Sequence, residues 1–248
     1  AAYYANTAPK IYKAETLLQP TSEGSSSGLG GSSLGGFAAL AGINLGGGDK
    51  STSSLAILES REFARSFIQK HNLLKDIFSE EWDSSTESWV SGTPPKLWDA
   101  VDVLRNDIRS INLDVTTGLI KLSIEWTDPK KAADWVRWML EDINNSLREK
   151  AGRKANQNLE YLKSEFENIE LSNMRNAIVS LMEREIEKKM TANVRKEFAF
   201  STLDSVETPP IGANIKPRKA IILALGFVFG GFLGVVLVIF LFINKKRP

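Results

Sequence analysis

Few residues in this chain have types and spacings that could perform chemistry. His71 is the single histidine among 248 residues, and cysteine is absent. The sequence contains no Gly-x-Ser-x-Gly nucleophile elbow, no His-Glu-x-x-His zinc motif and no dinucleotide-binding fingerprint. A lone histidine cannot supply a cluster of metal ligands. We therefore predict no catalytic residue, no metal site and no cofactor, and we interpret His71 as a helix C-terminal residue that interacts favourably with the helix dipole.

One Gly-rich stretch has part of the pattern of a nucleotide-binding loop. Gly42 to Ser51 reads GINLGGGDKS. A phosphate-binding loop needs Gly directly before Lys, and here Asp49 intervenes. No strand is predicted to lead into the stretch, so we do not expect it to bind a nucleotide.

The charge balance narrows the range of partners. Lys and Arg number 31 and Asp and Glu number 30, which gives a formal net charge of +1. A dedicated nucleic-acid binder would show a basic excess, so nucleic acid is not an expected partner. The lack of cysteine also excludes disulfides.

The longest apolar stretch runs from Ala220 to Ile243 and contains no charged residue. As a helix, its 24 residues would span roughly 36 Å, enough to cross a hydrocarbon core of roughly 30 Å. Gly226, Gly230 and Gly234 lie four residues apart. Together with Gly231 they predict a face on which another membrane helix can pack closely.

Basic residues flank this predicted transmembrane helix on both sides. Pro217, Arg218 and Lys219 precede it and are predicted to lie at the membrane interface, where long basic side chains reach the head groups. Each flank carries three basic residues, so the positive-inside rule does not decide the orientation. The first residues, AAYYA, are typical of the aromatic edge of a membrane segment. Two alternatives follow from these residues, a further transmembrane helix before Ala1 or a signal peptide that has been removed, and the family resemblance described below favours the helix.

The N-terminal part of the body is predicted to contain a strand and a long loop. Residues 11–19 indicate a strand that Pro20 ends. Residues 21–50 are rich in Gly and Ser and are predicted to form a flexible loop. Four apolar residues in this loop are candidates for contacts with a partner: Phe37, Leu40, Ile43 and Leu45.

The middle of the chain predicts short helices and a hairpin. Residues 51–72 form an apolar helical face with a break near Ser60, and residues 98–109 predict a short helix. The irregular stretch from residue 73 to residue 99 contains three tryptophans. Residues 111–115 and 120–126 alternate strictly and predict a β-hairpin with one buried face.

The next part predicts a long helical hairpin. Asp128 and Pro129 are typical of a helix start, and apolar residues then recur at spacings of three and four to about Glu170. Such a helix would extend roughly 60 Å, further than a compact domain of this size. A second helix over residues 173–198 is expected to return antiparallel. Its apolar face contains Met174, Ile178, Leu181, Met190 and Val194.

Together these elements predict an α+β fold. It has a membrane-proximal α/β base with the β-hairpin in its sheet, a long helical hairpin arm and a C-terminal transmembrane helix. The predicted organisation is the start of the base (1–20), the loop (21–50), the α/β base (51–128), the arm (129–200), a return strand and Pro-containing linker (201–219), the transmembrane helix (220–243) and a short C-terminal tail (244–248).

Several of these segments resemble one protein family when they are taken together. The segments are the loop GLGGSSLGGFAALAGINLGGG, then LAILESREFARSFIQKHNLL, LIKLSIEWTDPKKAADWV, MRNAIVSLMEREIEKKMTANVRKEFAFSTLD and PRKAIILALGFVFGGFLGVVLVI. They are similar to Wzz-type chain-length determinants, the polysaccharide co-polymerases of the bacterial inner membrane. The resemblance covers essentially the whole chain. It departs after Asp204, where Ser-Val-Glu-Thr-Pro stands in place of the family's Pro-Ala-x-x-Pro.

The resemblance implies a non-catalytic protein that regulates the chain length of O-antigen or a related surface polysaccharide. It implies a periplasmic body, a cytosolic C-terminus and a ring of identical subunits, such as an octamer. The implied partners are a Wzy-type polymerase, the growing lipid-linked polysaccharide and membrane lipids. One alternative is a transmembrane adaptor that activates a separate bacterial tyrosine kinase in capsule or exopolysaccharide export. Another is a periplasmic sensor, which would need a cytosolic output domain.

Overall fold

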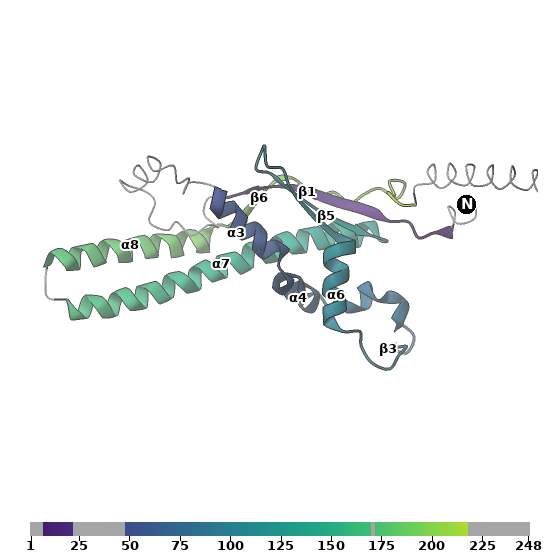
Figure 1. Ribbon diagram of the computed structural model, residues 1–248, viewed down its shortest axis with the longest axis horizontal. Helices are drawn as coiled ribbons and strands as arrows, with labels where there is room; N and C mark the ends of the chain where they lie inside the picture. Colours follow the sequence, from purple (N-terminus) through teal and green to yellow (C-terminus); the bar gives the residue numbers. More distant parts are fainter. Residues whose placement is uncertain (1–6, 22–47, 170–171, 218–248) are drawn as a thin grey trace, which may run out of the picture.

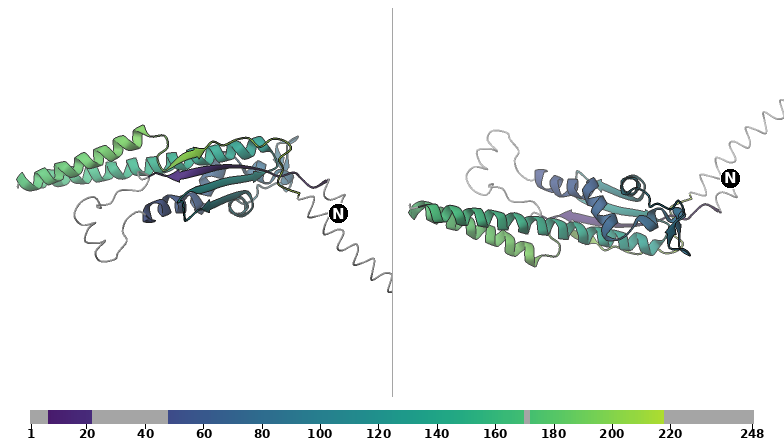
Figure 2. Two further views of the ribbon diagram at one scale, coloured as in Figure 1. Left: turned by 90° about the horizontal axis from the view of Figure 1, so that it is seen from above. Right: turned by 90° about the horizontal axis from the view of Figure 1, so that it is seen from below.

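The computed structural model describes residues 7–21, 48–169 and 172–217 and shows a mixed helix-and-sheet base from which a helical hairpin projects (Figure 1). Figure 2 shows that this hairpin makes the molecule long in one direction. The elements in chain order are β1 (Tyr12–Pro20), α3 (Gly48–Glu59), α4 (Arg61–Lys70), α5 (Leu74–Ile77), the 3₁₀ turn η1 (Ser79–Glu81), β2 (Trp82–Asp83), β3 (Ser88–Trp89), α6 (Leu97–Val103), the π-helical turn η2 (Leu104–Ile108), β4 (Arg109–Leu113), β5 (Ile120–Trp126), α7 (Pro129–Asn168), α8 (Ser172–Val194) and β6 (Phe200–Asp204).

The centre of the base is a four-stranded antiparallel sheet in the order β4-β5-β1-β6. The predicted hairpin is confirmed as β4 and β5, which pair from Arg109 with Ile124 to Leu113 with Ile120. The amide of Gly118 donates to the carbonyl oxygen of Asp114 at 2.7 Å in the connecting turn. Gly118 has a φ of +71°, a conformation that a residue without Cβ adopts at low cost.

One face of the sheet is buried against the helices. Ile120, Leu122 and Ile124 of β5 are completely buried, and Ala14 and Leu18 of β1 lie in the same core. Successive residues of a strand point to opposite faces, so the residues between them form a second, largely polar face, on which Lys121 is exposed and Ser123 is buried. In Figure 1 the helices α4, α6 and α7 lie on one side of the sheet, as this alternation requires.

The predicted break between two helices is present at Ser60. Its hydroxyl oxygen accepts a hydrogen bond from the amide of Phe63 at 3.1 Å and so caps α4. The preceding end of α3 is completed by Arg109, whose buried guanidinium donates to the carbonyl oxygens of Leu58 (2.7 Å) and Glu59 (3.3 Å). Burial lowers the pKa of Arg109 to about 10, so the side chain remains charged at neutral pH. This contact ties the α3 end to the edge strand β4.

The long helix α7 belongs to both the base and the arm. Asp128 caps it by accepting from the amides of Lys130 and Lys131, and Pro129 occupies its first position, as predicted. Its 40 residues span roughly 60 Å at about 1.5 Å per residue. The buried residues of its first half recur at helical spacing against the sheet and end at Leu147. Beyond that point α7 leaves the base and pairs with α8 (Figure 1).

The chain returns along α8 and closes the sheet with β6. β6 pairs antiparallel with β1, so segments from the two ends of the described chain are neighbours. Asn144 of α7 fixes this closure and is almost completely buried. Its side-chain oxygen accepts from the amides of Ala199 (2.7 Å) and Phe200 (3.0 Å), and its nitrogen donates to the carbonyl oxygen of Phe200 (3.1 Å).

The structure therefore confirms a small antiparallel sheet and a long helical hairpin in a mixed fold. Among residues 7–21, 48–169 and 172–217, none of the helices combines the length and the apolar character needed to cross a bilayer. The segment for which the sequence predicts a membrane span, 220–243, lies outside these residues, as does most of the predicted loop, 22–47.

Candidate interaction surface on the helical arm

The arm exposes an unusual number of large apolar side chains on α8. Val179, Ile186, Met190 and Val194 follow one another at intervals of seven, four and four residues, so they share one flank of the helix. Their exposed fractions run from 40% at Val179 to 80% at Val194. We call these four residues the α8 stripe. A helix flank of this composition normally packs against another element.

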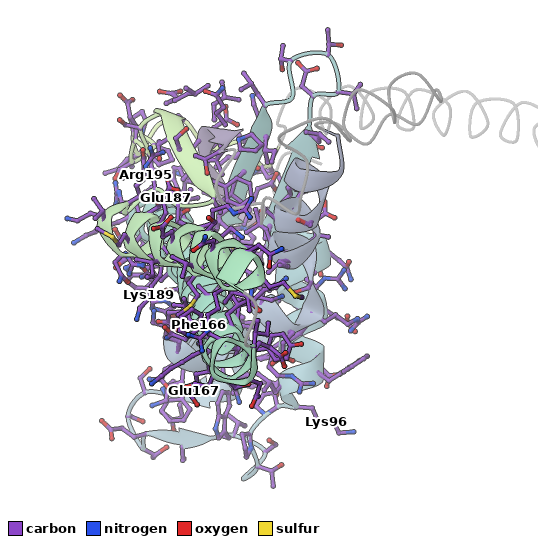
Figure 3. The ribbon with its side chains drawn as sticks, turned by 90° about the vertical axis from the view of Figure 1, so that its left-hand side faces the viewer. Lys96, Phe166, Glu167, Glu187, Lys189 and Arg195 are labelled. Atoms are coloured by element: carbon purple, nitrogen blue, oxygen red, sulfur yellow. The ribbon has the colours of Figure 1, made fainter. Side chains whose placement is uncertain are left out.

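A shallow hollow accompanies the α8 stripe at its C-terminal half. It has a volume of about 490 Å³ and is lined by Glu183, Ile186, Glu187, Met190, Thr191, Val194 and Arg195. Figure 3 looks along the arm from its tip and shows Glu187 and Arg195 on the α8 side of the hairpin, with Phe166 and Glu167 on the α7 side. Such a surface, apolar with charged edges, is suited to contact with another protein surface.

The apolar face that the sequence predicts for α8 is not the face that packs in the structure. Of Met174, Ile178, Leu181, Met190 and Val194, only Ile178 is buried in the structure. The side of α8 that meets α7 includes Ala192 and the carboxylate of Glu185, whose side chain is 13% exposed and pairs with Lys188. α8 is held at its start by Arg175, which donates to the carbonyl oxygen of Ile169 at 2.7 Å, and at its end by the closure of β6 on Asn144. These contacts fix its rotation. The most apolar flank is therefore left on the surface.

The opposite end of the molecule brings the outer ends of the described chain together. The amide of Ile11 donates to the carbonyl oxygen of Lys216 at 3.1 Å, and the amide of Ile215 donates back to Ile11 at 2.8 Å. The ammonium of Lys216 pairs with Glu125 at 2.7 Å, which connects this junction to β5. Pro217 follows directly and is half-buried. It is the last described residue, and the other predicted interface residues, Arg218 and Lys219, lie outside the described part.

The remaining predicted site residues also lie outside the described part of the chain. They are Gly226, Gly230, Gly231 and Gly234 of the predicted membrane helix, and Phe37, Leu40, Ile43 and Leu45 of the loop. Of all the predicted site residues, the structure places only Pro217. It reveals instead the α8 stripe, of which the sequence interpretation had included Met190 and Val194 as packing residues.

The single histidine has a structural role that the sequence did not reveal. His71 follows the end of α4, as predicted, but its Nε2 also lies 2.8 Å from a carboxylate oxygen of Asp142 in α7. Lys70 donates to the other oxygen of Asp142, and this hydrogen bond raises the pKa of Lys70. The imidazole stacks on Trp138, with ring centroids 4.5 Å apart. The cluster fastens α4 to α7, and nothing near His71 in the sequence could have indicated a partner in the later helix.

The described residues offer no arrangement for metal chemistry. Within 7–21, 48–169 and 172–217, no three side chains of His, Asp or Glu come together in a way that could hold a metal ion. His71 and Asp142 are only two such groups, and Lys70 occupies the second carboxylate oxygen.

Comparisons with known proteins give a loose resemblance at the level of structure. The chain is similar to a full-length bacterial polysaccharide co-polymerase, with a TM-score of 0.39 and 11% identity over 100% of this chain and 91% of the other. It is also similar to a fragment of WzzB, a polysaccharide co-polymerase from Salmonella Typhimurium, with a TM-score of 0.35 and 10% identity over 84% of this chain and 100% of the other. No protein-family description matches the sequence, and no curated protein matches it. At these values the likeness is weak and assigns no role to any residue.

Proposed function

We propose that this chain is a non-catalytic polysaccharide co-polymerase of the bacterial inner membrane. In this proposal it regulates the chain length of O-antigen or a related surface polysaccharide that a Wzy-type polymerase makes. The observation that supports the proposal is that the two ends of the molecule have different features. The outer ends of the described chain meet at Ile11 and Lys216, and the arm with its exposed α8 stripe projects in the opposite direction (Figure 1).

The end at Lys216 suits attachment to a membrane. Only Arg218 and Lys219 separate Pro217 from the 24-residue apolar stretch Ala220–Ile243. Three residues reach at most about 10 Å, so a membrane entered at Ala220 would lie directly under this end of the base. The body then stands in the periplasm with its arm directed away from the bilayer, and the C-terminus is cytosolic. Pro217, Arg218 and Lys219 occupy the interface.

The α8 stripe suits assembly of identical subunits. Each copy carries the same exposed apolar flank at the same height above the membrane, and repeating one contact around an axis closes a ring. An octamer is one such ring. Within the bilayer, the face formed by Gly226, Gly230, Gly231 and Gly234 would pack against a neighbouring helix, either from this protein or from the polymerase. The apolar loop residues Phe37, Leu40, Ile43 and Leu45 would provide a further contact with neighbours, with the glycan or with the polymerase.

Control of chain length in this proposal does not require catalysis by this chain. A ring could act through its geometry, through contact with the growing lipid-linked polysaccharide, or through the time for which the polymerase stays on one chain. Membrane lipids surround the helical anchor in each case. The arm is the part of the described structure whose size and contacts such a mechanism would use.

The direct test is complementation. The full chain is expressed in a bacterium that has the cognate polymerase but lacks this protein, and the surface polysaccharide is separated by length on a gel. We expect an unregulated distribution without the chain and a narrow modal distribution with it. The same broad distribution in both strains, with the chain present in the membrane, would contradict the proposed function.

The topology has its own test. A reporter enzyme that is active only in the periplasm, inserted in the Gly/Ser-rich loop between residues 22 and 47, is expected to be active. Activity there of a reporter that functions only in the cytosol would overturn the proposed orientation.

A further inference from the structure

The segment between α5 and α6 lies apart from the core. Residues 79–98 contain η1, the small hairpin β2–β3 and the first residues of α6, and not one of these residues is buried. Their backbone is held by local bonds, such as that from the amide of Val90 to the carbonyl oxygen of Glu81 at 2.9 Å. We call residues 79–98 the indole lobe. Leu97 is half-buried and packs against the hydrophobic core, and the other apolar side chains of the lobe are not among those that contact it.

The indole lobe nevertheless contains three of the six tryptophans of the chain. Trp82 and Trp89 face each other across the hairpin, edge to face, with centroids 5.0 Å apart. Trp98 is 53% exposed, and the neighbouring Val90 is 73% exposed. Aromatic side chains outside a core are costly to leave in water, so this concentration indicates a contact surface.

Basic side chains accompany two of these rings. The ammonium of Lys75 lies 4.0 Å from the ring centroid of Trp82, and the guanidinium of Arg61 lies 4.2 Å from that of Trp98. Tryptophan beside lysine or arginine is typical of the head-group region of a bilayer, where the ring meets the apolar boundary and the cation meets phosphate.

The position of the indole lobe determines what can reach it. Along the long axis, β3 and its surroundings lie toward the end where the outer ends of the described chain meet, away from the arm tip (Figures 1 and 2). Pro217 lies at that end, and the apolar stretch from Ala220 begins three residues later. A lobe at this level that extends sideways from the base is within reach of the same membrane surface.

We infer that the indole lobe rests on the lipid head groups and forms a second, interfacial attachment of the body beside its helical anchor. This inference rests on the proposed function, because that proposal places the membrane at this end. The lobe carries four acidic residues, Glu80, Glu81, Asp83 and Glu87, and one basic residue, Lys96. Its attachment therefore depends on the indole rings, and anionic lipid does not strengthen it.

The absence of cysteine makes a direct test possible. Val90→Cys in the full chain is labelled with an environment-sensitive fluorophore, and the protein is reconstituted in vesicles of phosphatidylethanolamine and phosphatidylglycerol. A quencher attached to the lipid near the head groups is then added. Two matched single-cysteine variants serve as references: Ile211→Cys near the predicted anchor and Tyr161→Cys on the arm, both strongly exposed.

We expect the lipid quencher to reduce the fluorescence at Val90 and at Ile211 about threefold or more relative to Tyr161. Removal of phosphatidylglycerol should leave the quenching at Val90 unchanged. Replacing Trp89 and Trp98 by serine should bring the Val90 label to the level of Tyr161, while the Ile211 label stays quenched.

The reference positions separate the possible failures. Quenching at Ile211 without quenching at Val90 would overturn the interfacial attachment and leave the proposed function standing. Loss of quenching at both positions would overturn the membrane placement and the inference together. If polysaccharide from the same bacterium shields the Val90 label from an aqueous quencher while the lipid quencher has no effect, the lobe binds glycan and the lipid inference is wrong.

Discussion

Asn144 shows how one side chain can hold the arm to the base. It is almost completely buried and makes three hydrogen bonds to the backbone of Ala199 and Phe200, where the chain enters β6. A buried backbone group that loses its partner costs about 1–3 kcal/mol, so this residue is a main determinant of the closure between α8 and the sheet.

Asn144→Ala is therefore expected to destabilise the fold. Allowing for water that enters the vacated space, we expect a loss of about 2–4 kcal/mol in the free energy of unfolding, or roughly 5–10 °C in Tm. Thermal unfolding of the full chain in detergent measures it. Asn156→Ala in the exposed part of the same helix is the matched control and should leave Tm nearly unchanged. Equal Tm values for the two variants would show that the buried bonds do not stabilise the closure.

The hydrogen bonds of Asp83 should make the stability of the turn in the indole lobe depend on pH. The hydroxyl and the amide of Ser85, with help from Thr86, donate to its carboxylate and lower its pKa from 3.8 to about 2. A lowered pKa in the folded state means that the charged carboxylate stabilises the turn above pH 3.8 and that this contribution disappears as the pH falls toward 2. We expect the anisotropy of a label at Val90 to drop across this window.

Asp83→Asn is the control for this transition, because the amide oxygen still accepts hydrogen bonds but does not titrate. The drop in anisotropy between pH 4 and 2 should be absent in this variant. The same drop in both proteins would assign the transition to other carboxylates.

At the residue scale, the sequence predicts those features that depend on residues close together in the chain, such as helix caps and turns. The cap at Asp128 with Pro129, the break at Ser60 and the turn before Gly118 were all predictable, because each uses bonds between residues a few positions apart. The partners of Asn144 and of His71 were not, since each lies more than 50 positions away.

At the element scale, the rotation of α8 decides what the arm presents to its surroundings. The lengths of α7 and α8 follow from helical periodicity, but the pattern on α8 is weak, with apolar residues on more than one flank. Its rotation is fixed by the hydrogen bond from Arg175 to Ile169 and by the closure on Asn144, which are tertiary constraints. The sequence alone could predict a helical hairpin, but it could not predict that Val179, Ile186, Met190 and Val194 stay on the surface.

Met190→Glu tests whether the α8 stripe mediates self-association. Met190 is 62% exposed in a single chain, so the substitution should leave the fold intact. In an interface between copies it would bury a carboxylate, and we expect association to weaken roughly 10-fold to 100-fold. The mass of the detergent-solubilised full chain as a function of concentration measures this. Ser180→Glu adds the same charge at another exposed position of α8 and should not change the mass. Unchanged association of Met190→Glu would remove the stripe from the interface.

At the scale of the whole molecule, we propose a base fixed to a membrane and an arm that reaches away from it. If such a protein controls polysaccharide length, the arm could act as a simple ruler. The α8 stripe argues otherwise, because any change in arm length also moves apolar residues that would contact the neighbouring subunit. The length of the arm and the assembly of subunits therefore both depend on α8.

Matched deletions distinguish these ideas. Removing residues 157–163 of α7 together with 177–183 of α8 shortens the arm by roughly 10 Å and preserves the helical phase. We expect a series of such deletions to shift the modal polysaccharide length irregularly, because each one alters subunit packing as well as reach. A modal length that falls in proportion to the residues removed, read from polysaccharide ladders on a gel, would support the ruler instead.

The most direct test of the central claim compares polysaccharide ladders from cells with the native chain, Met190→Glu and Ser180→Glu. The claim is that subunits joined through the α8 stripe regulate chain length. It predicts a narrow modal distribution with the native chain and with Ser180→Glu, and a broad, unregulated one with Met190→Glu at equal amounts of membrane-inserted protein. A native distribution from Met190→Glu, with its self-association lost in detergent, would contradict the claim.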